Sequence, residues 1–354
     1  MINKIEKIQS FLQQGEAALV TSGQNRFYLT GFPSSAGVVL VTKKNAYFLI
    51  DFRYFEKARK TVAHCEVILH ERGGISVMDL LGKDNVQRLF VETEQTSAAE
   101  FCRMKERYGD ILSDSDEFDK YISRLREIKD EKELALIREA QKLTDDTFSY
   151  ILNNIKAGRT ELEVMLDMEF YMRKLGSEGV SFDFIVVSGK NSSLPHGVPT
   201  NKVIEKGDFL TMDFGAVVGG YHSDMTRTVA VGSVTEEMER VYNTVAAAQD
   251  AAFKVIKPGT VCSDVDKASR DLIYGAGYEG CFGHGLGHGV GVEIHEDPNF
   301  NAICETKLEK GMVMTVEPGI YLEDKFGVRI EDMVFITDDG YENITKSDKS
   351  LIIL

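Results

Sequence analysis

Two aspartates, Asp213 and Asp224, stand in the segment LTMDFGAVVGGYHSDMTRT at 210–228, whose strand-forming runs and central glycines are typical of a β-hairpin. A turn centred on Val218 and Gly219 would place Asp213 directly opposite Asp224, with their side chains roughly 4.5–5.5 Å apart. Like charges at that separation repel one another unless a cation lies between them. The segment therefore predicts either a solvated hairpin that carries two carboxylates or one half of a divalent-metal site.

Three of the seven histidines gather in the segment HGLGHGVGVEIHE: His284, His288 and His295. Glycine at that density disfavours a helix, so these histidines do not form a helical metal clip of the HExxH kind. We expect a strand or tight loop that presents them one by one, with the glycines allowing the backbone to approach a ligand closely. The alternative is a glycine-rich loop in which the histidines are incidental.

Two glutamates interrupt apolar strands near the end of the chain, Glu317 in VMTVEPG and Glu331 in GVRIEDMVFI. An acid inside an apolar strand is usually paired or coordinated, because burying an unpaired charge is costly. Period-2 alternation places Arg329 on the same face as Glu331. A single such acid would favour a buried salt bridge, whereas two of them beside the aspartates and a histidine favour a metal centre.

The summed charge of these acids suggests how many ions they hold. Two aspartates and two glutamates contribute four negative charges, which two divalent cations would neutralise. Oxygen-rich ligation with one imidazole suits Mn²⁺, our first expectation, and equally Co²⁺, Zn²⁺ or Fe²⁺, because ligand softness does not choose among them. Two such ions lower the pKa of water towards neutrality, so the expected chemistry is hydrolysis.

The motifs MDFGA, SDMTRT, HGLGHGVGVEIHE, TVEPGIY and VRIED together resemble the metallopeptidase family with the pita-bread fold, which includes methionine aminopeptidase, prolidase, aminopeptidase P and creatinase. The resemblance covers about residues 130–345. It implies that Asp213 chelates one ion, that Asp224 and Glu331 bridge both, that His288 binds one, and that Glu317 is a ligand and a proton shuttle.

The same resemblance gives roles to residues around the ions. His196, in the loop KNSSLPHGVPT, and His295 match positions that contact the substrate or stabilise the tetrahedral intermediate. His284 matches a residue on the proline side of the substrate, and Arg329 matches one that orients the metal-bound aspartate. Imidazole donors beside an oxyanion would stabilise it more strongly than water does.

The family branch is indicated by the N-terminal part of the chain. Methionine aminopeptidases usually lack a separate domain of this size, whereas proline-specific members and creatinase carry one. Because all five ligand positions are filled, we expect an enzyme that cuts the Xaa-Pro bond of a di- or oligopeptide, of the proline dipeptidase (prolidase) type. The alternatives are aminopeptidase P acting on longer peptides, an aminopeptidase of other specificity, and a non-catalytic binding protein of the same fold. A cation that binds a free carboxylate would favour dipeptides, and the sequence does not identify one.

The length of 354 residues favours two domains. Strand and helix alternate over the first hundred residues, which predicts a small α/β domain at 1–125, like the creatinase N-terminal domain. A charged stretch without Gly or Pro, 115–133, predicts an exposed helical connector. Residues 126–354 then form the catalytic domain, and the fold class as a whole is α+β.

The elements expected to position the site follow in order. Helices are predicted over 133–155, over 161–175 with Thr160 as N-cap, and at about 236–256 and 263–276. The strand SFDFIVVSG delivers the loop that carries His196. Each half of the second domain thus contains a hairpin and two helices, an arrangement that would fit an ancient duplication.

Composition excludes several partners. The formal charge of −15 disfavours nucleic acid, and no apolar run reaches the roughly 20 residues of a membrane helix. The first fifteen residues read as a polar amphipathic helix rather than a signal peptide, and five scattered cysteines indicate reduced thiols. We expect a cytoplasmic protein that does not bind membranes, and the resemblance implies a homodimer.

Overall fold

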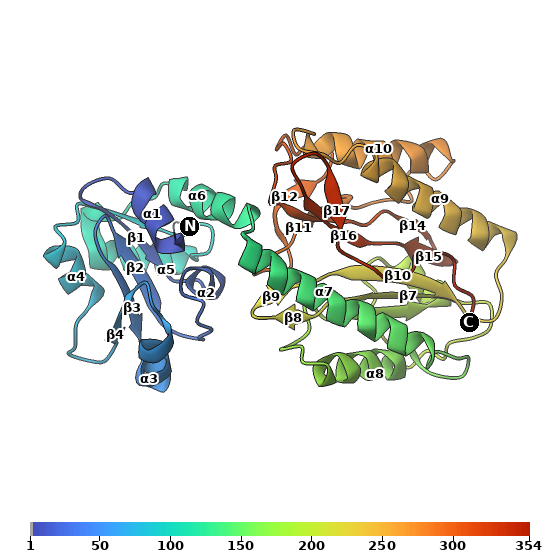
Figure 1. Ribbon diagram of the computed structural model, residues 1–354, viewed down its shortest axis with the longest axis horizontal. Coiled ribbons are helices and arrows are strands. Elements are labelled where there is room, and N and C mark those ends of the chain that lie inside the picture. The colour runs from blue at the N-terminus through green and yellow to red at the C-terminus, as the bar shows by residue number, and fades with distance from the viewer. Residues whose placement is uncertain (1–2) are drawn as a thin grey trace. The chain divides into compact units, whose positions relative to one another are not determined.

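The computed structural model describes residues 3–354, and the chain divides after Leu125 into two compact units (Figure 1). The elements of the first unit are α1 (Lys4–Phe11), β1 (Glu16–Val20), α2 (Gly23–Thr30), β2 (Val38–Thr42), β3 (Ala46–Ile50), α3 (Phe52–Thr61), β4 (Glu66–Leu69), α4 (Val77–Lys83), β5 (Arg88–Val91), α5 (Ala98–Tyr108) and most of α6 (Glu117–Glu127). None of the helices within residues 3–354 is both long enough and apolar enough to cross a membrane.

The first unit is built on a mixed sheet with the strand order β4-β3-β2-β1-β5. β1 pairs in parallel with β5 and β3 with β4, while β1–β2 and β2–β3 are antiparallel. Apolar residues such as Leu19, Leu40, Leu49 and Leu89 are buried against α4 and α5. The prediction of a small α/β domain is confirmed.

The prediction of an exposed helical connector at 115–133 is only partly right. Two helices cover the stretch, because α6 ends at Glu127 and Asp130 caps the next helix, whose first residue is Glu131. Phe118 and Ile122 are buried, since their spacing of four residues places them on one apolar face. Because the segment is rich in charged residues, its composition predicts exposure and gives no sign of this buried face.

The second unit contains paired helices and antiparallel sheets. Its elements are α7 (Glu131–Leu152), α8 (Glu161–Lys174), β6 (Ile185–Ser188), β7 (Phe209–Phe214), β8 (Val217–Val218), β9 (Tyr221–His222), β10 (Met225–Ala230), α9 (Glu236–Phe253), α10 (Cys262–Gly275), β11 (Gly287–Gly289), β12 (Glu296–Phe300), β13 (Val313–Val316), β14 (Gly319–Leu322), β15 (Phe326–Arg329), β16 (Asp332–Ile336) and β17 (Tyr341–Asn343). The predicted helices are confirmed, and Thr160 caps α8 in a capping box.

Each half of this unit packs a pair of helices on a sheet (Figure 1). In the first half, α7 and α8 bury Phe148 and Met168 against the sheet β10-β7-β6. In the second, α9 and α10 bury Val241 and Val265 against strands of the sheet β12-β11-β13-β16-β17. The loops and strand ends of the two sheets hold the residues of the site.

The predicted register of the aspartate hairpin is wrong by two residues. The turn lies at Gly219 and Gly220, both with positive φ (54° and 73°), so Val217 pairs with His222. Consecutive glycines favour a two-residue hairpin turn that requires positive φ at both central positions. Asp213 therefore lies opposite Thr226 rather than Asp224. Because side chains alternate with period two, this shift leaves every side chain on its predicted face.

Candidate metal centre and its surrounding cavity

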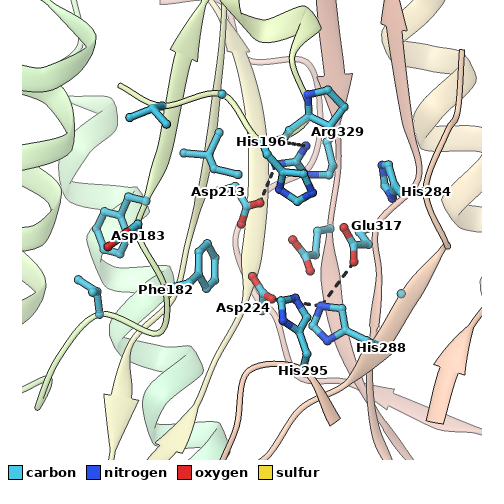
Figure 2. A pocket seen from close by; sticks show the side chains of 18 of the residues that line it. Phe182, Asp183, His196, Asp213, Asp224, His284, His288, His295, Glu317 and Arg329 are labelled. Atoms are coloured by element: carbon cyan, nitrogen blue, oxygen red, sulfur yellow. Dashed lines mark hydrogen bonds and ion pairs between the residues drawn. The ribbon is translucent and has the colours of Figure 1, made fainter. Parts of the chain in front are cut away.

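The acids and the histidine predicted as ligands converge from both halves of the second unit (Figure 2). They lie near the end of β7, directly before β10, in the middle of β11, directly after β13 and directly before β16: Asp213, Asp224, His288, Glu317 and Glu331. Ligand atoms of Asp224, His288 and Glu331 all lie within 4.8 Å of one another. Segments more than a hundred residues apart in sequence thus supply one cluster.

His288 is oriented by its neighbours. Its Nδ1 lies 3.0 Å from the Gly289 carbonyl oxygen, which accepts a hydrogen bond if that nitrogen carries the proton. Its Nε2 then offers a lone pair to the cluster, 3.6 Å from Asp224 Oδ2 and 3.5 Å from Glu317 Oε1. The His288 backbone N–H donates to Thr315 Oγ1 at 3.0 Å. This geometry is that of an imidazole held ready to bind a cation.

A close approach of two strands places His288. A side chain at Gly287 would meet the Thr315 carbonyl oxygen of β13 at 2.1 Å, so only glycine allows β11 to lie there. The prediction that 284–291 forms a strand or tight loop is confirmed at β11. At Gly287, the glycine makes room for the neighbouring strand.

Several carboxylate oxygens in the cluster lack the donors that burial demands. Asp213 Oδ1, Asp224 Oδ1 and Glu331 Oε1 are buried without a hydrogen-bond partner among residues 3–354. Buried polar atoms are nearly always paired, because an unpaired one retains its full desolvation cost. The open oxygens belong to residues predicted as ligands, and hard divalent cations prefer such donors. The residues therefore fit divalent ions.

The electrostatics of the cluster agree with this fit. Burial raises the pKa of Asp224 well above its usual value, and repulsion from Glu331 and Asp213 adds to the effect. Burial likewise raises the pKa of Glu317 to about 8 and that of Glu331 well above its usual range. Burial lowers the pKa of His288 to about 4, which keeps the imidazole neutral. Neutral imidazole and ionised carboxylates are the forms that bind metal, and a bound cation would favour both.

Thr226 and Arg329 hold two of the acids in place. The Thr226 hydroxyl donates to Glu331 Oε2 at 2.7 Å and accepts from Arg329 Nε at 3.0 Å. Arg329 Nη2 donates to Asp213 Oδ2 at 2.6 Å, and both side chains of this ion pair are buried. Each acid thus has one oxygen fixed by a donor and the other left open towards the cluster.

His284 lies apart from the acids and contacts Tyr321. Its Nδ1 lies 2.8 Å from the Gly285 carbonyl oxygen, and its Nε2 lies 2.9 Å from the Tyr321 hydroxyl. Arg329 Nη1 donates to the same hydroxyl at 2.8 Å, so the Tyr321 O–H is left to donate to His284. Burial lowers the pKa of His284 to about 4 and raises that of Tyr321 to about 12. Hydrogen bonds thus lead from Asp213 through Arg329 and Tyr321 to His284, whose imidazole is neutral.

His196 and His295 border the cluster on the cavity side (Figure 2). The His295 ring meets the His288 ring edge-on, with 4.4 Å between centroids, and burial lowers its pKa. His196 is exposed within a cavity of about 810 Å³ that also contains the cluster. Apolar side chains form much of its wall: Leu162, Met165, Val180, Phe182, Phe184, Val198 and Phe300. The cavity can hold a short peptide with its backbone beside the acids.

A family model described as metallopeptidase family M24 matches residues 135–338, which contain every residue of the cluster. The chain belongs to metallopeptidase family M24. A second model, the creatinase/prolidase N-terminal domain, matches residues 4–128. The predicted family and the predicted pita-bread fold with a creatinase-like N-terminal domain are confirmed. Membership implies divalent metal ions, and it makes the chain a hydrolase.

Relatives resemble this M24 metallopeptidase over its whole length. The uncharacterized peptidase YqhT of Bacillus subtilis is 42% identical over 99% of this chain and 100% of its own. The solved structure of an Xaa-Pro dipeptidase from Bacillus anthracis is 41% identical, with a TM-score of 0.94 and 99% of each chain covered. That of an X-Pro aminopeptidase from Thermotoga maritima is 34% identical, with a TM-score of 0.88, and covers 98% of this chain and 100% of its own.

Thr226 and Tyr321 both lie in motifs quoted above, but no role was predicted for either residue. Thr226 follows Asp224 by two residues, so alternation places the two side chains on one face. That spacing was a usable signal. Tyr321 lies in a strand whose pairing partner is β15, and its contact with His284 depends on the tertiary fold. No local pattern indicated that contact.

Proposed function

We propose that this M24 metallopeptidase hydrolyses the peptide bond before proline. The observation that carries the proposal is the set of open carboxylate oxygens beside a neutral imidazole, all within one peptide-sized cavity. Relatives named Xaa-Pro dipeptidase and X-Pro aminopeptidase support proline at the position after the cut. An Xaa-Pro amide lacks an N–H and has a constrained φ, so a dedicated site is useful.

The metal ions would be held by Asp213, Asp224, His288, Glu317 and Glu331. When bound, divalent ions would activate water and polarise the carbonyl group of the substrate. The carboxylate of Glu317 is placed to accept a proton from the attacking water and to return it to the leaving proline nitrogen. The rings of His196 and His295 border the same space and can donate hydrogen bonds to the carbonyl oxygen as its charge develops.

Arg329 holds Asp213 in its orientation. The guanidinium is planar and donates to Asp213, Thr226 and the Tyr321 hydroxyl, so it cannot rotate without losing several bonds. His284 ends this hydrogen-bond chain with both ring nitrogens engaged. The apolar wall excludes water from the space between the acids and the substrate.

Two substrate lengths are compatible with this chemistry. The first candidate is the dipeptidase that the sequence predicted, which the Xaa-Pro dipeptidase of Bacillus anthracis supports by its similarity. The second is an aminopeptidase acting on longer peptides. Among the described residues that line the cavity, Arg329 is the one arginine or lysine, and its guanidinium is already engaged. Because the free carboxylate of a dipeptide would meet no other side-chain cation there, this observation favours the second candidate.

A set of matched peptides tests the proposal. The enzyme reconstituted with Mn²⁺ would be assayed on Ala-Pro, Ala-Pro-Ala and Ala-Ala-Ala, with release of the first residue measured. We expect cleavage before proline and little cleavage of the peptide without it. Release from Ala-Pro alone would identify a dipeptidase, and release from Ala-Pro-Ala alone an aminopeptidase. Equal rates for all three peptides would contradict proline specificity.

The expected homodimer and the preference for Mn²⁺ stay predictions. Light scattering of the purified protein would measure its mass directly, and a mass near 39.5 kDa would indicate a monomer. Comparing kcat/KM after reconstitution with Mn²⁺, Co²⁺, Zn²⁺ or Fe²⁺ would order the metals.

A further inference from the structure

Glu161, in the first turn of α8, is a fully buried acid outside the metal cluster. Its carboxylate contacts both ends of the segment 188–200, here called the His196 loop. At one end, the Ser188 backbone N–H donates to Oε1 at 2.6 Å, and the Ser188 hydroxyl does so at 3.0 Å. At the other end, the Thr200 backbone N–H donates to Oε2 at 3.1 Å, and its hydroxyl does so at 2.8 Å. One side chain thus joins the start of the loop to its end.

The middle of the His196 loop is held both by Glu161 and by β15. The Asn191 amide donates to both Glu161 oxygens, at 3.1 and 3.2 Å. The Gly327 backbone N–H donates to Ser192 Oγ at 2.9 Å, and Arg329 Nη1 donates to the Pro195 carbonyl oxygen at 3.3 Å. His196 therefore extends from a loop that Glu161 closes at its base and β15 holds near its tip.

We propose that Glu161 is a positioning residue that fixes the backbone of the His196 loop and, through it, the His196 ring. The catalytic part of this inference depends on the proposed function, since it assumes that His196 contacts the substrate. Leu194, His196 and Val198 near the tip of the loop are exposed, so packing alone does not fix this part of the backbone. A buried carboxylate that accepts charge-assisted hydrogen bonds at both ends is a strong closure for such a loop.

Only an acceptor on both oxygens satisfies this geometry. Glutamine has the size of glutamate but presents one oxygen and one NH₂ group. In either orientation its NH₂ would face the backbone N–H of Ser188 or of Thr200. Glu161→Gln therefore releases one end of the loop with almost no change in volume.

The first experiment measures the loop directly. Hydrogen exchange of the segment 188–200 would be compared for wild type, Glu161→Gln and the control Glu163→Gln. Glu163 lies in the same first turn, but its carboxylate accepts from the Thr160 backbone in the capping box and does not contact the loop. We expect exchange in 188–200 to rise about tenfold or more in Glu161→Gln alone, because opening is easier without the closure. Unchanged exchange would overturn the proposal, whatever the enzyme cleaves.

The second experiment tests whether Glu161 acts through His196. We expect Glu161→Gln to lower kcat/KM for Ala-Pro-Ala or Ala-Pro about tenfold to a hundredfold at unchanged metal content, since small misplacements of a catalytic group cost this much. In a His196→Ala background the same change should have little further effect. Fully additive losses would overturn a role through His196. If Glu161→Gln fails to fold, Thr200→Val removes one hydroxyl of the closure and should show the same pattern at smaller size. A wild type inactive on every Xaa-Pro peptide would contradict the proposed function, and the exchange result would still decide on the loop.

Discussion

Glu92 in the first unit and the acids of the metal centre are both buried, but their oxygens differ in one respect. Both Glu92 oxygens accept hydrogen bonds, from the backbone N–H groups of Thr21 and Ser22 at 2.6 and 2.8 Å and from Ser22 Oγ and Asn25 Nδ2 at 2.5 and 2.7 Å. Glu331 is as deeply buried, yet its Oε1 has no partner among residues 3–354. A saturated buried carboxylate joins parts of the fold, whereas open oxygens aimed at other acids require a cation.

The largest expected effect is the loss of function in Asp224→Asn. The amide keeps the size but removes a charge and one acceptor from the centre of the cluster. We expect metal content to fall from two ions per chain to about one and kcat/KM to fall at least about a thousandfold, more than the loss typical of residues that only support metal ligands. Metal analysis and the peptide assay measure the two effects. If Asp224→Asn kept its metal content and its kcat/KM, the open carboxylate oxygens would not differ in function from the hydrogen-bonded ones of Glu92.

Removing the metal should destabilise the protein more as pH rises. Because folding raises the pKa of Asp224, Glu317 and Glu331, these three acids bind more protons in the metal-free folded state than in the unfolded state above about pH 4. The contribution of these three acids to stability is then largest below their unfolded pKa values and falls as pH increases towards their folded pKa values, about 8 for Glu317. We expect the difference in Tm between metal-bound and dialysed metal-free protein to be larger at pH 8 than at pH 6.

Removing one of these acids should stabilise the metal-free protein rather than destabilise it. In the metal-free state at pH 8, Asp224→Asn should have a higher Tm than wild type, since one of the repelling charges is gone. Equal or lower Tm values would show that the acids do not repel one another as their pKa shifts imply.

Glu92→Gln should show the converse behaviour to Asp224→Asn. Its NH₂ group would face donors in either orientation, so buried hydrogen bonds to a charged acceptor are lost. We expect the free energy of unfolding to fall by about 2–3 kcal/mol, measured by denaturant titration, with metal content and kcat/KM unchanged. A loss of metal from Glu92→Gln would contradict a purely structural role for Glu92.

Tyr321→Phe has the smallest expected effect. It removes the hydroxyl between Arg329 and His284 but leaves the ion pair of Arg329 with Asp213. One lost hydrogen bond of about 1.4 kcal/mol corresponds to about a tenfold fall in kcat/KM. We expect this fall without loss of metal, and a thousandfold fall would mean that the hydroxyl takes part in the reaction itself.

Most of the fold was predictable because its local signals agree. The helices of the second unit have both apolar periodicity and caps, as α8 shows with Thr160 and Glu163. The hairpin register was not predicted correctly, because the turn expected at Val218 and Gly219 lies at the two adjacent glycines, Gly219 and Gly220. The buried face of α6 was hidden by its many charges.

The acids and histidines of the site could be predicted from the sequence, whereas the residues that hold them in place could not. Acids within apolar strands and histidines among glycines are unusual enough to indicate chemistry by themselves. Glu161, Thr226 and Tyr321 are ordinary residues in their local contexts. Their importance comes from contacts across the fold, such as the two ends of the His196 loop meeting at Glu161. No spacing in the sequence predicts such contacts.

Calorimetric titration of Mn²⁺ into the dialysed metal-free protein tests the central claim most directly. Asp213, Asp224, His288, Glu317 and Glu331 should together bind two ions per chain, with the second ion lost or greatly weakened in Asp224→Asn. A stoichiometry below one ion per chain, or an identical titration for Asp224→Asn, would contradict the account of the metal centre.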